Sequence, residues 1–315
     1  TYFGDQGDIT HTGNLSITNS GTGTTSEIRI ANNTNSLVTI TGNTSVINNN
    51  TALTTNRLYL GNQGDIVFNG TLDIINNSAS TNSEVLCNHN TNSNNLYNED
   101  ITVSTGIIGT DGIYFGQGNG SGILAATKTI TIPGIDTNNY IGGDLYFRNF
   151  TQTGPAPHSF ELASTAVYIY NYDSDWGGNV DFRSPRMYTR GTTYNGTAHL
   201  EKTGGIGDDA GAGGNTFVGN LTLANSGSRY IMTGNGTFDT FQANVNLLNT
   251  GTSHIYLAHN GAGHVISGDL TATNSATGTG TCQILIANST TATLAVSGNT
   301  TINQDGSATT LRTYF

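Results

Sequence analysis

A short apolar triplet returns along this sequence about every 28 residues, and a fixed period of that length restricts the fold more than any other feature. Each triplet is followed by a small residue, and the clearest copies begin at Ile28, Leu58, Val85, Ile113, Ile255 and Ile284. A second segment, of the form Gly-Asn-Leu-x-Ile, begins at Gly13, Gly42, Gly70, Gly219, Gly268 and Gly298. The spacings of both segments lie mostly between 27 and 30 residues.

Within both segments apolar residues alternate with period two, which is typical of strands with one buried face. Middle positions such as Arg29, Tyr59, Asp73 and Tyr114 vary in chemistry, as expected for an outward face. One repeat of this size cannot bury its apolar side alone, but stacked copies can bury one another. We therefore expect an all-β fold, a right-handed parallel β-solenoid of about eleven coils. A β-sandwich or barrel is the competing fold, but hairpins do not require the same triplet to return at this spacing.

The composition favours strands over helices, and it argues against nucleic acid and membranes as partners. Charged residues make up 10% of the 315 residues and the formal net charge is -11. With only two lysines there is no basic stripe to bind phosphates, so nucleic acid is not an expected partner. No apolar run approaches the roughly 20 residues that span a bilayer, so membrane insertion is not expected either. Abundant Asn, Thr, Ser and Gly disfavour helix.

The middle of the chain departs from the repeat. All four prolines, the only tryptophan and six of the ten basic residues lie between residues 128 and 202. We expect regular coils over residues 1–127, irregular coils with long loops over 128–215, and regular coils over 216–315, as one continuous domain. Residues 204–215, which are almost all Gly, Ala and Asp, are expected to form a flexible loop.

A binding site is expected in this irregular middle part of the chain. Tyrosines and a tryptophan alternate there with Asn and Asp, a combination of flat rings and hydrogen-bonding groups that suits sugars. The candidate binding residues are Tyr168, Tyr170, Tyr172, Asp173, Asp175, Trp176 and Asn179. The structural alternative is that these aromatic residues only cover a widened coil.

The same stretch suggests two other functions, calcium binding and polysaccharide cleavage. Asp173, Asp175 and Asn179, with Asp181 beyond, form part of a calcium-loop spacing without its closing Glu, so calcium is the one cofactor candidate. Parallel β-helix enzymes cleave polysaccharides with carboxylates and basic residues on one face. The residues that would have to converge for such catalysis are Asp173, Asp175, Asp181, Arg183, Arg186 and Arg190.

Histidines and cysteines give weaker signals. His254, His259 and His264 stand five apart, a spacing that fits neither one strand face nor one helix face, so they are not expected to bind a metal. Cys87 occupies the third position of a triplet, where it should point inward as a small apolar residue. Because several coils separate Cys87 from Cys282, we expect the two thiols to remain unpaired.

The ends of the sequence continue the repeat. Thr1-Tyr2-Phe3 opens the chain and Thr313-Tyr314-Phe315 closes it, each within an expected core triplet. Neither end shows a polar cap. Our hypothesis is that further coils continue past the ends, either in a longer chain or in further copies stacked end to end.

Residues 214–274 resemble the repeats of giant secreted cell-surface gliding adhesins of Bacteroidota, which are exported by the type 9 secretion system. The resemblance rests on the phrases GNLTLAN, IYLAHN and GTFDTF, and residues 13–102 echo it more loosely. It implies an extracellular, cell-surface protein that is adhesive or structural, with no family active site to transfer. We therefore expect a non-enzymatic segment of an adhesin or filament that binds glycans or surfaces. The alternative is a carbohydrate-active β-helix enzyme, either a polysaccharide lyase or a glycoside hydrolase.

Overall fold

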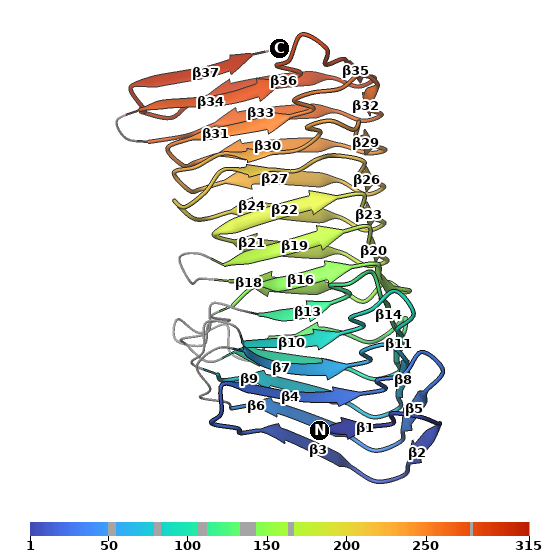
Figure 1. Cartoon of the computed structure of the whole chain (residues 1–315). Coiled ribbons are helices and arrows are strands. Elements are labelled where there is room, and N and C mark those ends of the chain that lie inside the picture. Colours follow the sequence, from blue (N-terminus) through green and yellow to red (C-terminus); the bar gives the residue numbers. More distant parts are fainter. Residues whose placement is uncertain are drawn as a thin grey trace. The chain divides into compact units, whose positions relative to one another are not determined.

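The computed structural model describes residues 1–49, 55–78, 83–105, 112–132, 143–162, 167–277 and 280–314. These residues form strands and turns without any helix, and the strands stack in parallel as a right-handed β-solenoid (Figure 1). The expected fold class is therefore confirmed. The chain divides into two compact units, one of Thr1–His158 with Leu162–Tyr170 and the other of Ser159–Glu161 with Asn171–Phe315. The described part has no helix able to span a membrane.

Unit 1 contains strands of three parallel sheets, and its first five coils each contribute one strand to each sheet. The first sheet holds β1 (Tyr2–Phe3), β4 (Thr25–Ile30), β7 (Thr55–Leu60), β10 (Ser83–Cys87), β13 (Ile113–Phe115) and β16 (Leu145–Arg148). The second holds β2 (Ile9–His11), β5 (Leu37–Ile40), β8 (Asp65–Phe68), β11 (Asn94–Tyr97), β14 (Ser121–Leu124) and β17 (Phe150–Gln152). The third holds β3 (Leu15–Asn19), β6 (Thr44–Asn48), β9 (Leu72–Asn76), β12 (Ile101–Thr105) and β15 (Ile130–Thr131).

Unit 2 repeats this plan. Its first strands are β22 (Arg186–Arg190) and, in a separate five-stranded sheet, β25 (Asp209–Ala210), β28 (Ile231–Met232), β31 (His254–Leu257), β34 (Thr281–Ile286) and β37 (Thr310–Tyr314). The second strands are β20 (Asp175–Trp176), β23 (Thr193–Tyr194), β26 (Thr216–Phe217), β29 (Thr240–Phe241), β32 (His264–Ile266) and β35 (Leu294–Val296). The third are β21 (Val180–Ser184), β24 (Ala198–Lys202), β27 (Leu221–Asn225), β30 (Val245–Asn249), β33 (Leu270–Asn274) and β36 (Thr300–Gln304). Two strands, β18 (His158–Glu161) and β19 (Tyr168–Tyr172), contain residues of both units.

The backbone conformation explains why the residue after each triplet is small. In unit 1 it lies in the left-handed region, with φ of 50° at Ala31, 77° at Gly61, 54° at Asn88 and 91° at Gly116. This conformation turns the chain sharply from the first sheet into the second, and Gly and Asn adopt it at the lowest cost. Gly61 is also required sterically, because a Cβ there would lie 2.4 Å from side-chain oxygens of the next coil.

Inside the coils, equivalent residues stack on one another. In unit 2 the rings of Tyr194 and Phe217 lie 4.9 Å apart, and those of Phe217 and Phe241 lie 5.3 Å apart, with nearly parallel planes. Phe115 and Phe147 form a similar pair in unit 1, with 5.3 Å between ring centroids. The exact repetition of strand register places like residues in contact, so the core consists of ladders rather than a mixed interior.

A second ladder consists of buried asparagines at the ends of β3, β6 and β9 in unit 1 and of β27, β30 and β33 in unit 2. Asn19, Asn48 and Asn76 are paired in register in unit 1, as are Asn225, Asn249 and Asn274 in unit 2. Most of their amides donate to backbone carbonyls of a first strand or of the turn before it, as Asn225 does to the carbonyls of His254 and Arg229 at 3.0 and 3.1 Å. Asn48 instead donates to Asn76 Oδ1 and Ser83 Oγ. Buried backbone carbonyls need such donors, which explains why the segment so often ends in Asn.

The structure corrects two expectations about the coils. Tyr59 and Tyr114 occupy outward positions but are buried, because they pack with Leu86 into a cluster on that face. Residues 204–215 are not simply a loop, since Asp209 and Ala210 form β25 and pair with Ile231 and Met232.

Two further expectations concern the cysteines and the chain ends. Cys87 and Cys282 are unpaired and buried, as expected. Burial raises the pKa of the Cys87 thiol to about 12. Of the closing triplet, Phe315 lies outside the described residues.

Candidate functional site

The first sheet of unit 1 carries an outward column of mainly aromatic residues. Strand register places its members opposite one another from coil to coil, in the order Tyr2, Arg29, Tyr59, Leu86, Tyr114 and Tyr146. Outward side chains of adjacent parallel strands lie about 4.8 Å apart, so this column is continuous along the stack. The sequence shows the triplets that make the column, but it does not show that their middle residues touch.

The column ends in a group of three half-buried tyrosines, which we call the tyrosine platform: Tyr146, Tyr168 and Tyr170. The ring centroids of Tyr146 and Tyr170 lie 5.3 Å apart, and those of Tyr168 and Tyr170 lie 4.4 Å apart with planes 16° from parallel. Tyr114 continues the group, with its ring centroid 5.5 Å from that of Tyr146. The backbone N–H of Tyr168 donates to Asp144 Oδ1 at 2.9 Å. Two of the predicted binding residues are thus held together beside a tyrosine that the prediction missed.

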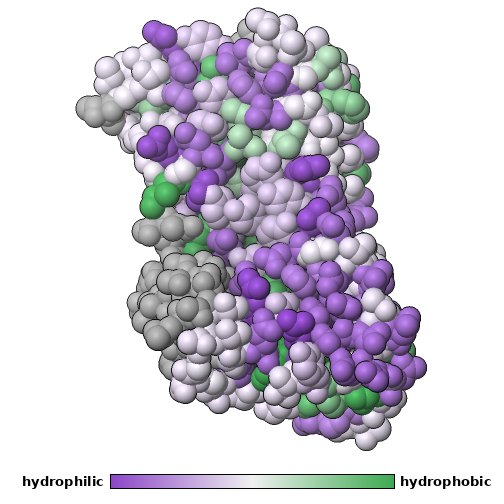
Figure 2. All heavy atoms as spheres, viewed as in Figure 1, coloured by the Kyte–Doolittle hydropathy of each residue, from purple (hydrophilic) through white to green (hydrophobic). Residues whose placement is uncertain are grey.

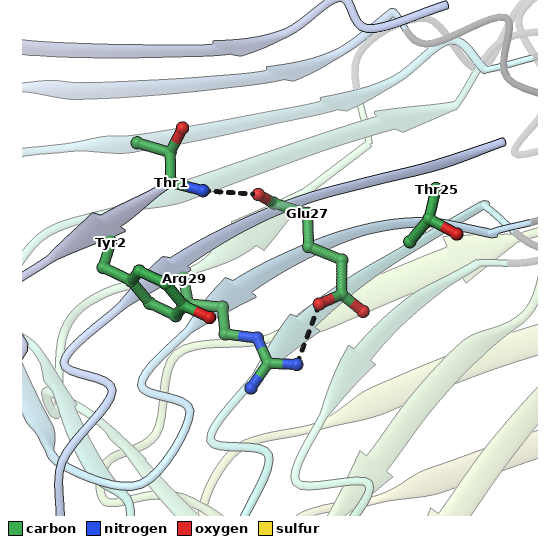
Figure 3. A pocket seen from close by; sticks show the side chains of 5 residues that line it. All are labelled: Thr1, Tyr2, Thr25, Glu27 and Arg29. Atoms are coloured by element: carbon green, nitrogen blue, oxygen red, sulfur yellow. Dashed lines mark hydrogen bonds and ion pairs between the residues drawn. The ribbon is translucent and has the colours of Figure 1, made fainter. Parts of the chain in front are cut away.

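The other end of the column contains a small pocket of about 180 Å³, lined by Thr1, Tyr2, Thr25, Glu27 and Arg29 (Figure 3). Arg29 forms an ion pair with Glu27 at 2.8 Å, and its guanidinium lies 4.9 Å from the ring centroid of Tyr59. The volume is below the range that usually holds a small molecule. We therefore assign no ligand to this pocket.

In unit 2, Trp176 lies in the core and is not exposed at all. Its Nε1–H donates to Asn171 Oδ1 at 3.1 Å, and its ring packs edge-on against Phe160 and Phe182. The prediction that Trp176 offers a flat ring to a sugar is therefore wrong. Alternation along β20 explains the error, because Asp175 faces outward and its neighbour Trp176 must face inward.

The other predicted residues of unit 2 lie on its surface. Tyr172 is half-buried, with its ring centroid 5.1 Å from that of Tyr188. Asp173 is exposed and occupies a turn with φ of 48°. Asp175 Oδ1 accepts from Asn195 Nδ2 at 2.6 Å, and Asn179 Oδ1 accepts from the N–H of Thr197 at 2.9 Å. Each of these two hydrogen bonds joins one coil to the next. Within the described ranges, no three His, Cys, Asp or Glu residues are grouped so that they could hold a metal ion.

A charged group, which we call the charged cluster, lies on the outer face of β21 and β24: Asp181, Arg183, His199 and Glu201. Register places Asp181 opposite His199 and Arg183 opposite Glu201. Arg183 binds both oxygens of Asp181 at 3.0 and 3.1 Å, and His199 Nδ1 lies 3.0 Å from Asp181 Oδ1. His199 Nε2 and Arg183 Nε each lie 3.8 Å from Glu201 Oε2.

The charged cluster brings together only part of the predicted catalytic set. Asp181 and Arg183 are in it, while Arg186 binds Asp209 elsewhere in unit 2 and Arg190 is exposed. His199 and Glu201 were missed, although both occupy outward positions of the alternating segment Ala198–Lys202. In the three coils that follow, the positions in register with them carry Thr222, Asn246 and Thr271, and Ala224, Leu248 and Thr273, all of them uncharged.

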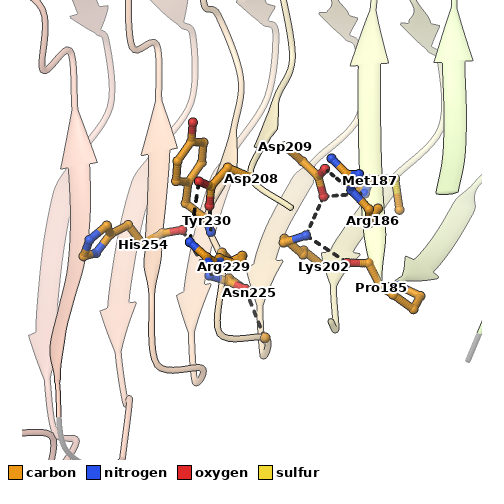
Figure 4. A network of polar contacts seen from close by, with 11 residues as sticks. Pro185, Arg186, Met187, Lys202, Asp208, Asp209, Asn225, Arg229, Tyr230 and His254 are labelled. Carbon is orange, nitrogen blue, oxygen red and sulfur yellow. Dashed lines mark hydrogen bonds and ion pairs between the residues drawn. The ribbon is translucent and has the colours of Figure 1, made fainter. Parts of the chain in front are cut away.

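A second charged group is buried (Figure 4). Lys202 is 0% exposed, and its Nζ donates to Asp209 Oδ2 at 2.5 Å and to the carbonyl of Pro185 at 2.8 Å. The other carboxylate oxygen of Asp209 accepts from Arg186 Nε at 3.0 Å, and the N–H of Met187 donates to Oδ2 at 3.0 Å. Burial lowers the pKa of Lys202, and the Asp209 carboxylate opposes that shift.

The buried pair fits the asparagine ladder. Lys202 is in register with Ser184 and Asn225, so its ammonium replaces the amide that donates to backbone carbonyls in other coils. Asp209 then balances the charge that this replacement introduces. A lysine where other coils have asparagine was the available sequence signal. The arrangement indicates a structural role.

A third polar group is buried in unit 2, around Asp239 at the turn that precedes β29. Asp239 Oδ1 accepts from the backbone N–H and the Nδ2 of Asn215, at 2.9 and 3.0 Å. The N–H of Asp239 donates to His264 Nδ1 at 3.0 Å, so His264 is neutral with its proton on Nε2. Burial raises the pKa of Asp239 to about 6 and lowers that of His264.

Replacing Asp239 by Asn should stabilise the protein at neutral pH. The folded chain keeps a proton on Asp239 up to a pKa of about 6, against an ordinary value of 3.8, so the free energy of unfolding falls as pH rises through this interval. At pH 7 the Asp239→Asn variant is expected to be more stable by about 1–3 kcal/mol, with little difference near pH 4. Urea unfolding at several pH values measures this. Both proteins contain His264, so their difference isolates Asp239, and equal profiles would contradict the assignment.

Comparison with known protein families, characterised proteins and solved structures gives no match for this chain.

Proposed function

We propose that this chain is a structural and adhesive β-solenoid of the cell exterior, a segment of a long surface adhesin or filament that binds glycans or surfaces without cleaving them. The observation that carries the proposal is the tyrosine platform, where three half-buried rings lie within 5.3 Å of a neighbour on an outward sheet face. Tyrosine presents an apolar ring with a polar tip, which suits the apolar faces and hydroxyl groups of sugars.

The rest of the surface supports this proposal. On the face seen in Figure 2, hydrophilic and neutral residues predominate and hydrophobic residues form small separate patches. Only 10% of the residues are charged, so hydroxyls and amides supply most of the polar groups. Such groups bind sugar hydroxyls without the cost of desolvating charges. Stacked coils also provide an extended scaffold for adhesion.

Affinity electrophoresis through gels that contain soluble polysaccharides tests the proposal. The chain is expected to be retarded by at least one polysaccharide, and retardation should be lost when Tyr146 and Tyr170 are both replaced by Ala. Replacing Tyr230 and Tyr256, a ring pair 5.2 Å apart in unit 2, is the matched control and should leave retardation unchanged. Equal mobility in every polysaccharide gel would contradict the proposal.

A second function, polysaccharide cleavage, is favoured by the charged cluster. His199 lies between Asp181 and Glu201, and a proton donor and acceptor on one open sheet face are what acid–base cleavage needs. The mutual ion pairing of Asp181 and Arg183 favours a structural role instead. The release of new reducing ends from a polysaccharide by the wild-type chain, but not by the Glu201→Gln variant, would establish the enzyme.

A further inference from the structure

We propose that the tyrosine platform binds an unbranched, uncharged, β-(1→4)-linked polysaccharide that runs across the strands of unit 1, with about one sugar ring for each coil. This inference rests on the proposed function and specifies its ligand.

The tyrosine rings of successive coils are evenly spaced. Tyr114, Tyr146 and Tyr170 follow one another with centroid distances of 5.5 and 5.3 Å. These distances come from strand spacing and are therefore imposed by the fold. They are close to the advance of one hexose unit along an extended β-(1→4)-linked chain. A sugar chain that crosses the strands would therefore keep its register with successive tyrosines, whereas a chain along one strand would not.

The exposed rings lie at one end of the column, so the sugar is expected to bind there. Tyr114 is 8% exposed, so it supports the platform rather than offering a face. Tyr146, Tyr168 and Tyr170 are each half-buried, which leaves part of every ring at the surface while packing fixes its orientation. Rings that are already ordered lose little side-chain entropy when they bind.

Charge decides between neutral and acidic sugars. Outward positions of β16 and its flank carry one acid, Asp144, and one base, Arg148, so the platform has no excess of positive charge. The whole chain has a net charge of -11, which repels an anionic polymer. Polar side chains beside the rings can still bind hydroxyls. A neutral polysaccharide is the ligand class that fits.

Calorimetric titration with cello-oligosaccharides, from disaccharide to hexasaccharide, tests the inference. The disaccharide is expected to gain most of the affinity and longer oligosaccharides only a few-fold more, because the exposed rings lie on two successive coils, β16 and β19, and one sugar meets each coil. Tyr146→Ala and Tyr170→Ala should each weaken binding of the longest oligosaccharide about tenfold, as expected for loss of one ring contact. Tyr146→Phe should bind like wild type, which separates loss of the ring from loss of the hydroxyl. Tyr256→Ala is the control, and circular dichroism checks that every variant is folded.

Two results would overturn this inference while leaving the proposed function intact. One is binding only to acidic oligosaccharides such as oligogalacturonates. The other is binding of cello-oligosaccharides with an affinity that rises equally with every added sugar up to the hexasaccharide or that ignores both alanine replacements. If no polysaccharide of any charge or linkage is bound, the proposed function fails as well.

Discussion

Replacing Asp209 by Asn is expected to lower the free energy of unfolding by about 3–5 kcal/mol, because it leaves the Lys202 ammonium buried without an anionic partner. Lys202 is 0% exposed and Asp209 is 1% exposed, so water cannot compensate. The substitution preserves the shape of the side chain, which limits the loss to charge and hydrogen bonding. Urea unfolding, together with native-state hydrogen exchange of the strands around Asp209, measures the effect.

The neighbouring residue provides a matched control. Asp208 contacts Arg229 at 3.9 Å with both side chains exposed, so Asp208→Asn should change stability by less than about 1 kcal/mol. Adding Lys202→Met to Asp209→Asn removes the unpaired charge and should recover much of the loss. Similar small effects for Asp208→Asn and Asp209→Asn would mean that the buried pair contributes nothing specific.

Replacing Phe217 by Ala should have a comparable effect, a loss of about 3–5 kcal/mol. Phe217 is fully buried and stacks on Tyr194 in one direction and on Phe241 in the other. Strand register fixes the three rings in one ladder, so the neighbours cannot move in to fill the cavity. The same unfolding experiment measures this loss.

Val218 follows Phe217 and is 36% exposed, so Val218→Ala should change stability by no more than about 0.5 kcal/mol. Phe217→Leu keeps most of the volume and should cost less than Phe217→Ala. If Phe217→Ala and Val218→Ala had equal effects, ladder stacking would not be the main source of stability in unit 2.

Much of the fold could be predicted because the same physical constraint recurs in every coil. The alternation around Ile28, Leu58 and Val85 identified inward positions, and the period of the repeat identified parallel stacking. The small residue after each triplet was visible as well, although its left-handed conformation was not. Such features are local and repeated, so a single sequence shows them many times.

The candidate sites were harder to predict, because they depend on register between coils of unequal length. Trp176 was expected at the surface because it lies among polar residues, yet alternation along a two-residue strand places it inside. Conversely, Glu201 and Asp181 lie 20 residues apart in sequence and share one cluster only because β21 and β24 pair. In the middle of the chain the coils are shorter than 28 residues, so the regular period did not show which residues are neighbours.

The proposed function distinguishes adhesion from cleavage, and one incubation measures both. The chain is mixed with an insoluble neutral β-(1→4)-linked glucan, and the pellet is assayed for bound protein while the supernatant is assayed for new reducing ends. We expect that the wild-type chain sediments with the glucan, that the variant with Tyr146 and Tyr170 both replaced by Ala stays in solution, and that no reducing ends form with either. Reducing ends that appear with the wild-type chain and disappear with the Glu201→Gln variant would contradict this expectation.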